Sequence, residues 1–321
     1  MSACKCNSSL QNTGFECSPL ISDSKRLLLN PLFGSSGALN FIDLANVGLN
    51  TQIFWDDMIN AASADDRLFP ISEHKNGTSV RSATIVETFD DDSKQRVNQG
   101  IRTQTIIIAG RAATPTYLKK LKAYACAKFG FYVVGRDKET TGTSHGEIVN
   151  GEALKMYPIR VDENTWDAIY TPAQGKNVAK ITVTFDWHID EQDEDLISLT
   201  GEEISPVNPL NFEGLIDVYA EYTNITTTRA TVELFTEFGP VTDPTGVEGL
   251  LVADFKGNTG TASKVYNLTT ALDITLTGAP ESPAGFYTLA FAAQTTGNQI
   301  QLSPMKNGFD FTNVKANPFT I

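Results

Sequence analysis

Runs of residues that alternate between apolar and polar constrain the fold of this chain more than any other feature of its sequence. In KITVTFDW, residues 180–187, Ile, Val, Phe and Trp alternate with Thr and Asp. A period of two is what a half-buried strand requires, because successive side chains point to opposite faces of a sheet. Such runs recur along most of the chain, so we expect a mainly β fold of antiparallel strands.

The alternating runs fall into two groups. The first group surrounds a single clear helix, which predicts an α+β layout: an antiparallel β-sandwich or partial barrel with one flanking helix. The second group holds short strands separated by turn residues, with no convincing helix, and predicts an immunoglobulin-like β-sandwich. The expected organisation is an extended N-terminal arm over residues 1–35, an assembly domain over 36–204, a proline-bearing linker over 205–214 and the C-terminal sandwich over 215–321.

The long helix of the first group is predicted to begin after residue 114. Thr114 suits the N-cap, Pro115 suits the first helical position and Gly130 suits the stop. Cys126 falls inside this helix and is interpreted as a small apolar residue. The basic side of the helix, which we expect to face solvent or a neighbouring subunit, consists of Lys119, Lys120 and Lys122.

A cluster of acidic residues follows the strand at 180–187, with no basic residue among them. The cluster comprises Asp190, Glu191, Asp193, Glu194 and Asp195. A catalytic acid and base pair needs two carboxylates held apart across a cleft, whereas five packed carboxylates mostly repel one another and stay solvated. We therefore interpret the cluster as a solvated negative surface, and not as a catalytic or metal site.

Other sequence signals of chemistry are weak. The three histidines, His74, His145 and His188, are scattered along the chain. No phosphate-binding loop, dinucleotide-binding glycine pattern or zinc-protease motif is present, so no cofactor is expected.

Charge and composition narrow the partners. The 321-residue chain has a net charge of -13, and phosphate binding needs clustered Lys and Arg, so we expect no grip on nucleic acid. DNA that passes without binding is compatible with this charge. No apolar run approaches the ~20 residues of a membrane span, and the N-terminus lacks the layout of a signal peptide. We expect folding in a cytoplasm and no membrane partner.

The cysteines near the N-terminus leave three alternatives open. Cys4, Cys6 and Cys17 lack the paired spacing of a four-ligand zinc site. They are free thiols on a flexible arm, a metal clip completed elsewhere, or a disulfide formed after release.

The order of elements resembles one family. A hairpin with an acidic turn leads into GIR, then into the capped helix ATPTYLKKLKAYACAKFG, the strand FYVVGRD, the segment KMYPIRVDENTW and the strand KITVTFDW, which ends in acid. This order is similar to that of bacteriophage tail-tube proteins and related ring-forming proteins. The N-terminal C-x-C…NTG…C pattern is similar to leaders on virion proteins of phages that infect Bacteroidetes.

The resemblance covers about residues 36–200. It implies a non-enzymatic subunit of a tail tube or of a tail or neck ring, whose partners are copies of itself and other virion proteins. It also implies a virion protein made in the host cytoplasm, with the immunoglobulin-like domain on the outside. The resemblance also implies that the acids from Asp190 to Asp195 face the lumen of the ring or a subunit contact. A negative wall would repel phosphate within a Debye length of ~8 Å, so genomic DNA would pass without specific binding.

Two other functions fit the same sequence. One is a capsid decoration or head protein. The other is a carbohydrate-binding adhesin module, which would expose aromatic side chains on one face of the C-terminal sandwich.

Overall fold

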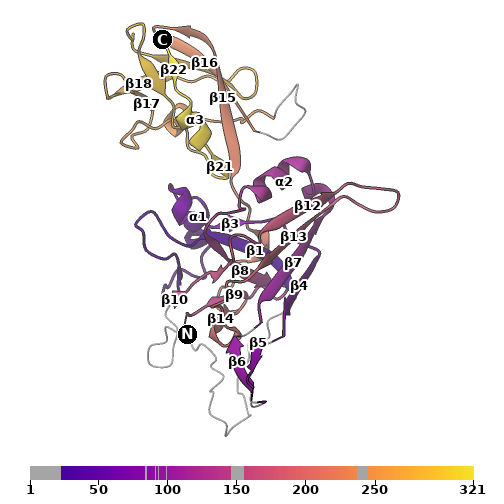
Figure 1. Cartoon of the computed structure of the whole chain (residues 1–321). Coiled ribbons are helices and arrows are strands. Elements are labelled where there is room, and N and C mark those ends of the chain that lie inside the picture. The colour runs from indigo at the N-terminus through magenta and orange to yellow at the C-terminus, as the bar shows by residue number, and fades with distance from the viewer. Residues whose placement is uncertain are drawn as a thin grey trace. The chain divides into compact units, whose positions relative to one another are not determined.

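The computed structural model describes residues 23–83, 85–90, 92, 94–98, 100–145, 155–236 and 245–321 (Figure 1). The chain divides into two compact units, Met1–Gly214 and Leu215–Ile321. The described part is mainly β, with antiparallel sheets and few helices, as the sequence predicts. The division falls at the residue where the C-terminal sandwich was expected to begin.

Two sheets build the first unit. One sheet has the order β14-β9-β8-β1-β3 with β11 also on β8, and the other has the order β12-β13-β7-β4. The strands of the first sheet are β1 (Ser24–Pro31), β3 (Phe69–Pro70), β8 (Phe129–Gly135), β9 (Thr140–Thr143), β11 (Ile159–Arg160) and β14 (Leu196–Leu199). Those of the second sheet are β4 (Asn76–Arg81), β7 (Arg102–Ala109), β12 (Asp167–Thr171) and β13 (Lys180–Asp186). Two short pairs complete the unit, β2 (Ile42–Asp43) with β10 (Lys155–Met156) and β5 (Ile85–Thr88) with β6 (Lys94–Asn98).

The core of the first unit lies between the two sheets. Leu29 and Phe131 of the first sheet pack in one cluster with Val183 and Phe185 of the second. Phe185 is fully buried, and its ring stacks on that of Trp166 with 5.0 Å between centroids. Each such side chain contributes roughly 1.5–3 kcal/mol when it is fully buried. The alternation of KITVTFDW therefore has the predicted cause, one face in the core and one face outside.

The prediction of an extended arm over residues 1–35 is wrong from Ser24 onward. Residues 24–31 form β1, which pairs with β8 from Leu27↔Val133 to Pro31↔Phe129. Leu27, Leu28 and Leu29 each have 0 % exposure. A strand buried on both faces is a continuous apolar run without alternation, so the period of two could not reveal it. Residues 1–22 lie outside the described part.

The segment predicted as a linker, residues 205–214, packs on the first unit instead. Val207 is 4 % exposed and Phe212 is 2 % exposed. The Phe212 ring lies 5.3 Å from that of Trp55, on α1 (Gln52–Ile59), and the Arg26 guanidinium donates to the Phe212 carbonyl. The two prolines therefore shape an ordered strap, and not a loose connection.

The predicted long helix is shorter than expected. Helix α2 spans Pro115–Lys122, and the Thr114 hydroxyl accepts a hydrogen bond from the Tyr117 amide at 3.1 Å, as a cap should. The chain then turns, and Cys126 adopts a left-handed φ of 68°. Gly130, the predicted stop, lies in β8, where a Cβ would come within 2.7 Å of the Ile159 carbonyl oxygen. Cys126 is thus an exposed residue beyond the helix, and not an apolar residue inside it.

One path of eight hydrogen-bonded strands forms the second unit, in the order β21-β15-β16-β19-β18-β17-β20-β22. The path curls around its core, since Tyr222 and Phe319, near opposite ends of it, have ring centroids 4.9 Å apart. Its elements are β15 (Ile216–Thr226), β16 (Arg229–Thr236), β17 (Lys264–Asn267), β18 (Leu272–Gly278), β19 (Phe286–Phe291), β20 (Gln299–Gln301), β21 (Phe309–Asp310), α3 (Thr312–Ala316) and β22 (Phe319–Thr320).

A buried histidine predicts how the first unit responds to acid. His74 has 0 % exposure, and its Nε2 lies 2.9 Å from the Ser24 hydroxyl, whereas its Nδ1 has no hydrogen-bond partner among the described residues. Burial lowers the pKa of His74 to about 4. The unfolded chain binds this proton near the ordinary pKa of about 6.5, so acid favours unfolding between these two values.

We expect the free energy of unfolding to fall by about 3 kcal/mol from this group as pH drops through that window. Urea unfolding of the wild type and of His74→Gln, at several pH values from neutral to about 4.5, measures it. The variant should lose most of the slope, and the matched control His188→Gln, at a half-exposed site, should keep it. Equal slopes for wild type and His74→Gln would contradict the assignment.

Candidate functional site: the acidic segment

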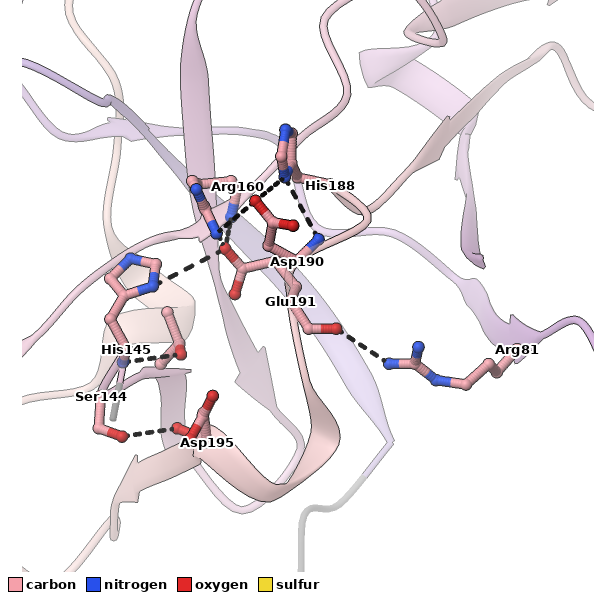
Figure 2. A network of polar contacts seen from close by, with 9 residues as sticks. Arg81, Ser144, His145, Arg160, His188, Asp190, Glu191 and Asp195 are labelled. Carbon is pink, nitrogen blue, oxygen red and sulfur yellow. Dashed lines mark hydrogen bonds and ion pairs between the residues drawn. The ribbon is translucent and has the colours of Figure 1, made fainter. Parts of the chain in front are cut away.

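The acidic segment, residues 187–195, lies where the chain passes from β13 in one sheet to β14 in the other. The Trp187 amide donates to the Arg102 carbonyl at 2.8 Å, and the His188 amide donates to the Arg160 carbonyl at 2.9 Å. These bonds hold the segment against β7 and β11, so that it closes one end of the sandwich. Figure 2 shows the polar contacts that converge there.

Glu191 is the buried carboxylate of the segment. It is 3 % exposed, and its Oε1 accepts a hydrogen bond from Arg160 Nε at 2.6 Å (Figure 2). His145 approaches the same oxygen, with Nδ1 at 4.0 Å. A buried carboxylate is tolerated only when it is paired and hydrogen-bonded, because removal from water otherwise costs several kcal/mol. Arg160 therefore makes the position of Glu191 possible.

Asp190 makes weaker contacts at the surface. His188 Nδ1 lies 3.3 Å from Asp190 Oδ2, and an Arg160 terminal nitrogen lies 3.8 Å from the same oxygen. The Asp190 side chain is 65 % exposed. Exposed pairs contribute about 0–1 kcal/mol, so this contact adds little to stability.

Asp193 bridges two arginines. One carboxylate oxygen lies 2.8 Å from a terminal nitrogen of Arg81, and the other lies 2.7 Å from one of Arg102. Partial burial acts in the opposite direction, but the hydrogen bonds from both arginines lower the pKa of Asp193 below its ordinary value. The Arg102 guanidinium also lies 4.8 Å from the centre of the Trp187 ring.

The last two acids of the segment, Glu194 and Asp195, make different contacts. The backbone carbonyl of Asp195 accepts hydrogen bonds from the Ser144 amide at 2.8 Å and from its hydroxyl at 3.2 Å (Figure 2). Glu194 is exposed, and within the described residues its carboxylate makes no ion pair. Asp195 thus helps to fix the segment through its main chain, and Glu194 remains a solvated acid.

The prediction that the packed carboxylates mostly repel one another and stay solvated is therefore wrong for Glu191 and Asp193, which pair with arginines. The arginines that contact Asp190, Glu191 and Asp193 lie 30 to 112 residues away in sequence. The local pattern could not reveal them. In the structure each arginine stands at a strand end: Arg81 ends β4, Arg102 begins β7 and Arg160 ends β11. Reversing the charge of Glu191 or Asp193 is consequently expected to impair folding, and not only to change a surface.

The carboxylates of Glu191 and Asp193 both accept hydrogen bonds from arginine nitrogens. In the part of the chain that the structure describes, no three or more His, Cys, Asp or Glu side chains form a group suited to a metal ion. The same residues include no helix long and apolar enough to cross a membrane.

The other predicted site residues lie apart from this network. Lys119 and Lys122 are exposed and Lys120 is half-buried, all in α2. Arginines and histidines make the ion pairs described above for the acidic segment. The prediction of a subunit contact at the lysines stays a prediction. Cys4, Cys6 and Cys17 lie outside the described residues, so their state also stays a prediction.

Searches of protein-family models and of curated proteins found no match to this chain.

The pairing of Glu191 with Arg160 predicts that loss of the Glu191 charge destabilises the fold more than loss of the Glu194 charge. Glu191→Gln removes the charge that compensates Arg160, so we expect it to lower the free energy of unfolding by about 1–3 kcal/mol. The matched control Glu194→Gln makes the same charge change at an exposed site and should stay within about 0.5 kcal/mol. Chemical denaturation near neutral pH measures both. Equal effects would show that Glu191 is not a structural ion pair.

Proposed function

We propose that this chain is a non-enzymatic structural subunit of a bacteriophage virion, which self-assembles into a tail tube or a tail or neck ring around a DNA conduit. Three features support the proposal: the order of elements, the mainly antiparallel fold with a flanking helix, and the structural use of the acidic segment. The single observation that carries it is that the second sheet of the first unit ends in two strands, β4 and β12, each of which has one paired strand among the described residues.

Strands β4 and β12 are the edges of this sheet. Each pairs with one neighbour among the described residues, β4 with β7 and β12 with β13. Four strands that alternate in direction leave the two edge strands antiparallel to each other, so β12 of one copy can continue the same pattern on β4 of the next. Pairing of one edge with the other edge is head-to-tail, and repeated head-to-tail contacts close into a ring when the rotation allows it.

The side chains at the two edges suit such a joint. Val80 lies directly opposite Thr103, and Ile169 lies directly opposite Thr182, which places both on the outer face of the sheet. Val80 is 64 % exposed and Ile169 is 58 % exposed. Apolar side chains at both edges of one face would cover each other across the joint, and full burial contributes roughly 1.5–3 kcal/mol per side chain.

The outer face of this sheet is the best candidate for the conduit wall. It presents threonines, with the hydroxyls of Thr105 and Thr184 3.3 Å apart, and Asp186, which accepts from the Thr103 hydroxyl at 2.6 Å. Lys180 stands on the same face at the end of β13. A wall made mostly of neutral hydroxyls with a single lysine still holds phosphate poorly, because such binding depends on clustered Lys and Arg. The acidic segment would add a net charge of only −2 per copy, because three arginines offset three of its five carboxylates.

The alternatives receive different support. The adhesin hypothesis expects aromatic side chains exposed on the C-terminal sandwich, yet Phe255, Tyr287 and Phe291 are buried in its core. The capsid decoration or head hypothesis shares the self-assembling fold, and electron microscopy of particles distinguishes it by the location of the protein.

The edge strands predict a variant that folds but does not assemble. Ile169→Lys places a charge at the joint, and we expect loss of rings or tubes in negative-stain images while the free energy of unfolding changes by only about 0.5 kcal/mol. The matched control Leu272→Lys changes an equally exposed apolar residue of the second unit, which is 64 % exposed, and should assemble normally. Normal rings from Ile169→Lys would contradict assembly through β12.

The packed strap predicts where the chain can be shortened. A chain that ends at Gly214 keeps Val207 and Phe212 in place and should fold and assemble without the second unit. A chain that ends at Ser205 loses both, so we expect its free energy of unfolding to be lower by roughly 3–6 kcal/mol. Thermal and urea unfolding of the two chains test this. Equal stability would mean that the strap does not belong to the first unit.

A further inference from the structure

The acidic segment meets a second feature of the fold at the base of the β5–β6 hairpin. The chain leaves β4 at Arg81, forms the hairpin, and enters β7 at Arg102. Arg81 and Arg102 are direct partners in the register of β4 and β7. Among the described residues, β5 and β6 pair only with each other, and Figure 1 shows the hairpin extending beyond the ends of β4 and β7.

Two like charges therefore face each other at the point where the hairpin leaves the sheet. The Arg81 and Arg102 side chains are only 19 % and 22 % exposed, so water screens them poorly. Directly opposite like charges destabilise a strand pair. Asp193 contacts both guanidiniums, at 2.8 and 2.7 Å, and supplies the negative charge that the pair requires.

The backbone at the same point is also closely fitted. A Cβ on Gly100 would lie 1.9 Å from the Ser82 carbonyl oxygen, so only glycine allows this approach. The Ser82 amide donates to the Ile101 carbonyl at 2.8 Å, and Arg81 donates to the Gly100 carbonyl at 2.8 Å. The two strands at the base of the hairpin are thus held together by these hydrogen bonds and by the contacts of Asp193 with both arginines.

We infer that Asp193 is a positioning residue, which fixes the direction in which the β5–β6 hairpin leaves the sandwich and thereby presents it to a second copy of the chain. Its role in presentation rests on the proposed function. The hairpin carries exposed apolar side chains, with Val86 at 47 % and Phe89 at 43 % exposure. An isolated two-stranded hairpin is marginally stable, so its direction depends on its base, where the bridge lies.

The direction of the hairpin is measurable without assembly. Spin labels at Thr88→Cys on the hairpin and Thr171→Cys on β12, in a background with the native cysteines replaced by serine, report one distance by double electron–electron resonance. Both sites are exposed. Dilute protein with Asp193 intact should give a narrow distribution of distances between the two labels, and Asp193→Asn should broaden this distribution. The matched control Glu194→Gln, which removes one charge from the neighbouring exposed acid, should stay narrow.

A second variant isolates the repulsion between the arginines. Arg102→Gln together with Asp193→Asn removes one like charge as well as the bridge and keeps the Arg81 hydrogen bond to the Gly100 carbonyl. The distance distribution should therefore narrow again relative to Asp193→Asn alone. The double variant also tests the inference if Asp193→Asn alone does not fold. A narrow distribution in Asp193→Asn, or one in the double variant as broad as in the single variant, would overturn the inference.

An assembly assay tests the second part of the inference, the presentation of the hairpin to a second copy. We expect Asp193→Asn to raise the protein concentration needed for half-maximal assembly by about tenfold, with Glu194→Gln unchanged. A broadened hairpin with unchanged assembly would overturn its presentation to a second copy. If even the wild type forms no rings, the proposed function fails, whereas the spin-label distances still decide whether Asp193 positions the hairpin.

Discussion

Compensation of buried charge is the constraint on which the end of the first sandwich depends. A carboxylate that is 3 % exposed, as Glu191 is, needs a hydrogen-bonded partner to offset its removal from water. The arginines that face the acidic segment come from the ends of β4, β7 and β11, so one short segment contacts both sheets. The apolar core brings the sheets together, and the ion pairs decide how the chain crosses between them.

The parts of this fold that follow from local periodicity were predictable. The alternation at 180–187 identified β13, and the Thr114 cap identified the start of α2. β1 was missed, because a strand buried on both faces does not alternate. The end of α2 was misplaced, since Gly130 serves a close approach between strands and not a helix stop. In each case the missing information was a neighbour that is distant in sequence.

In the candidate site, too, the local sequence revealed only part of the arrangement. Its acids were visible in the sequence, but their role depends on Arg81, Arg102 and Arg160, which the fold brings from elsewhere. Composition suggested repulsion among like charges, and the structure has paired charges instead. Fold alone does not imply function, so the argument for assembly rests on edges and contacts, and not on the β architecture itself.

Net charge then limits how copies of this chain can meet. Each copy carries -13, so contacts that brought acidic surfaces together would be opposed within a Debye length of about 8 Å. The β4 edge avoids this cost, because from Asn76 to Val80 it offers no acidic side chain, only polar, glycine and apolar residues. Open edges normally invite uncontrolled pairing. In the assembly that we propose, an edge with one apolar residue gains most from the register that covers Val80, and this would favour an ordered ring over aggregation.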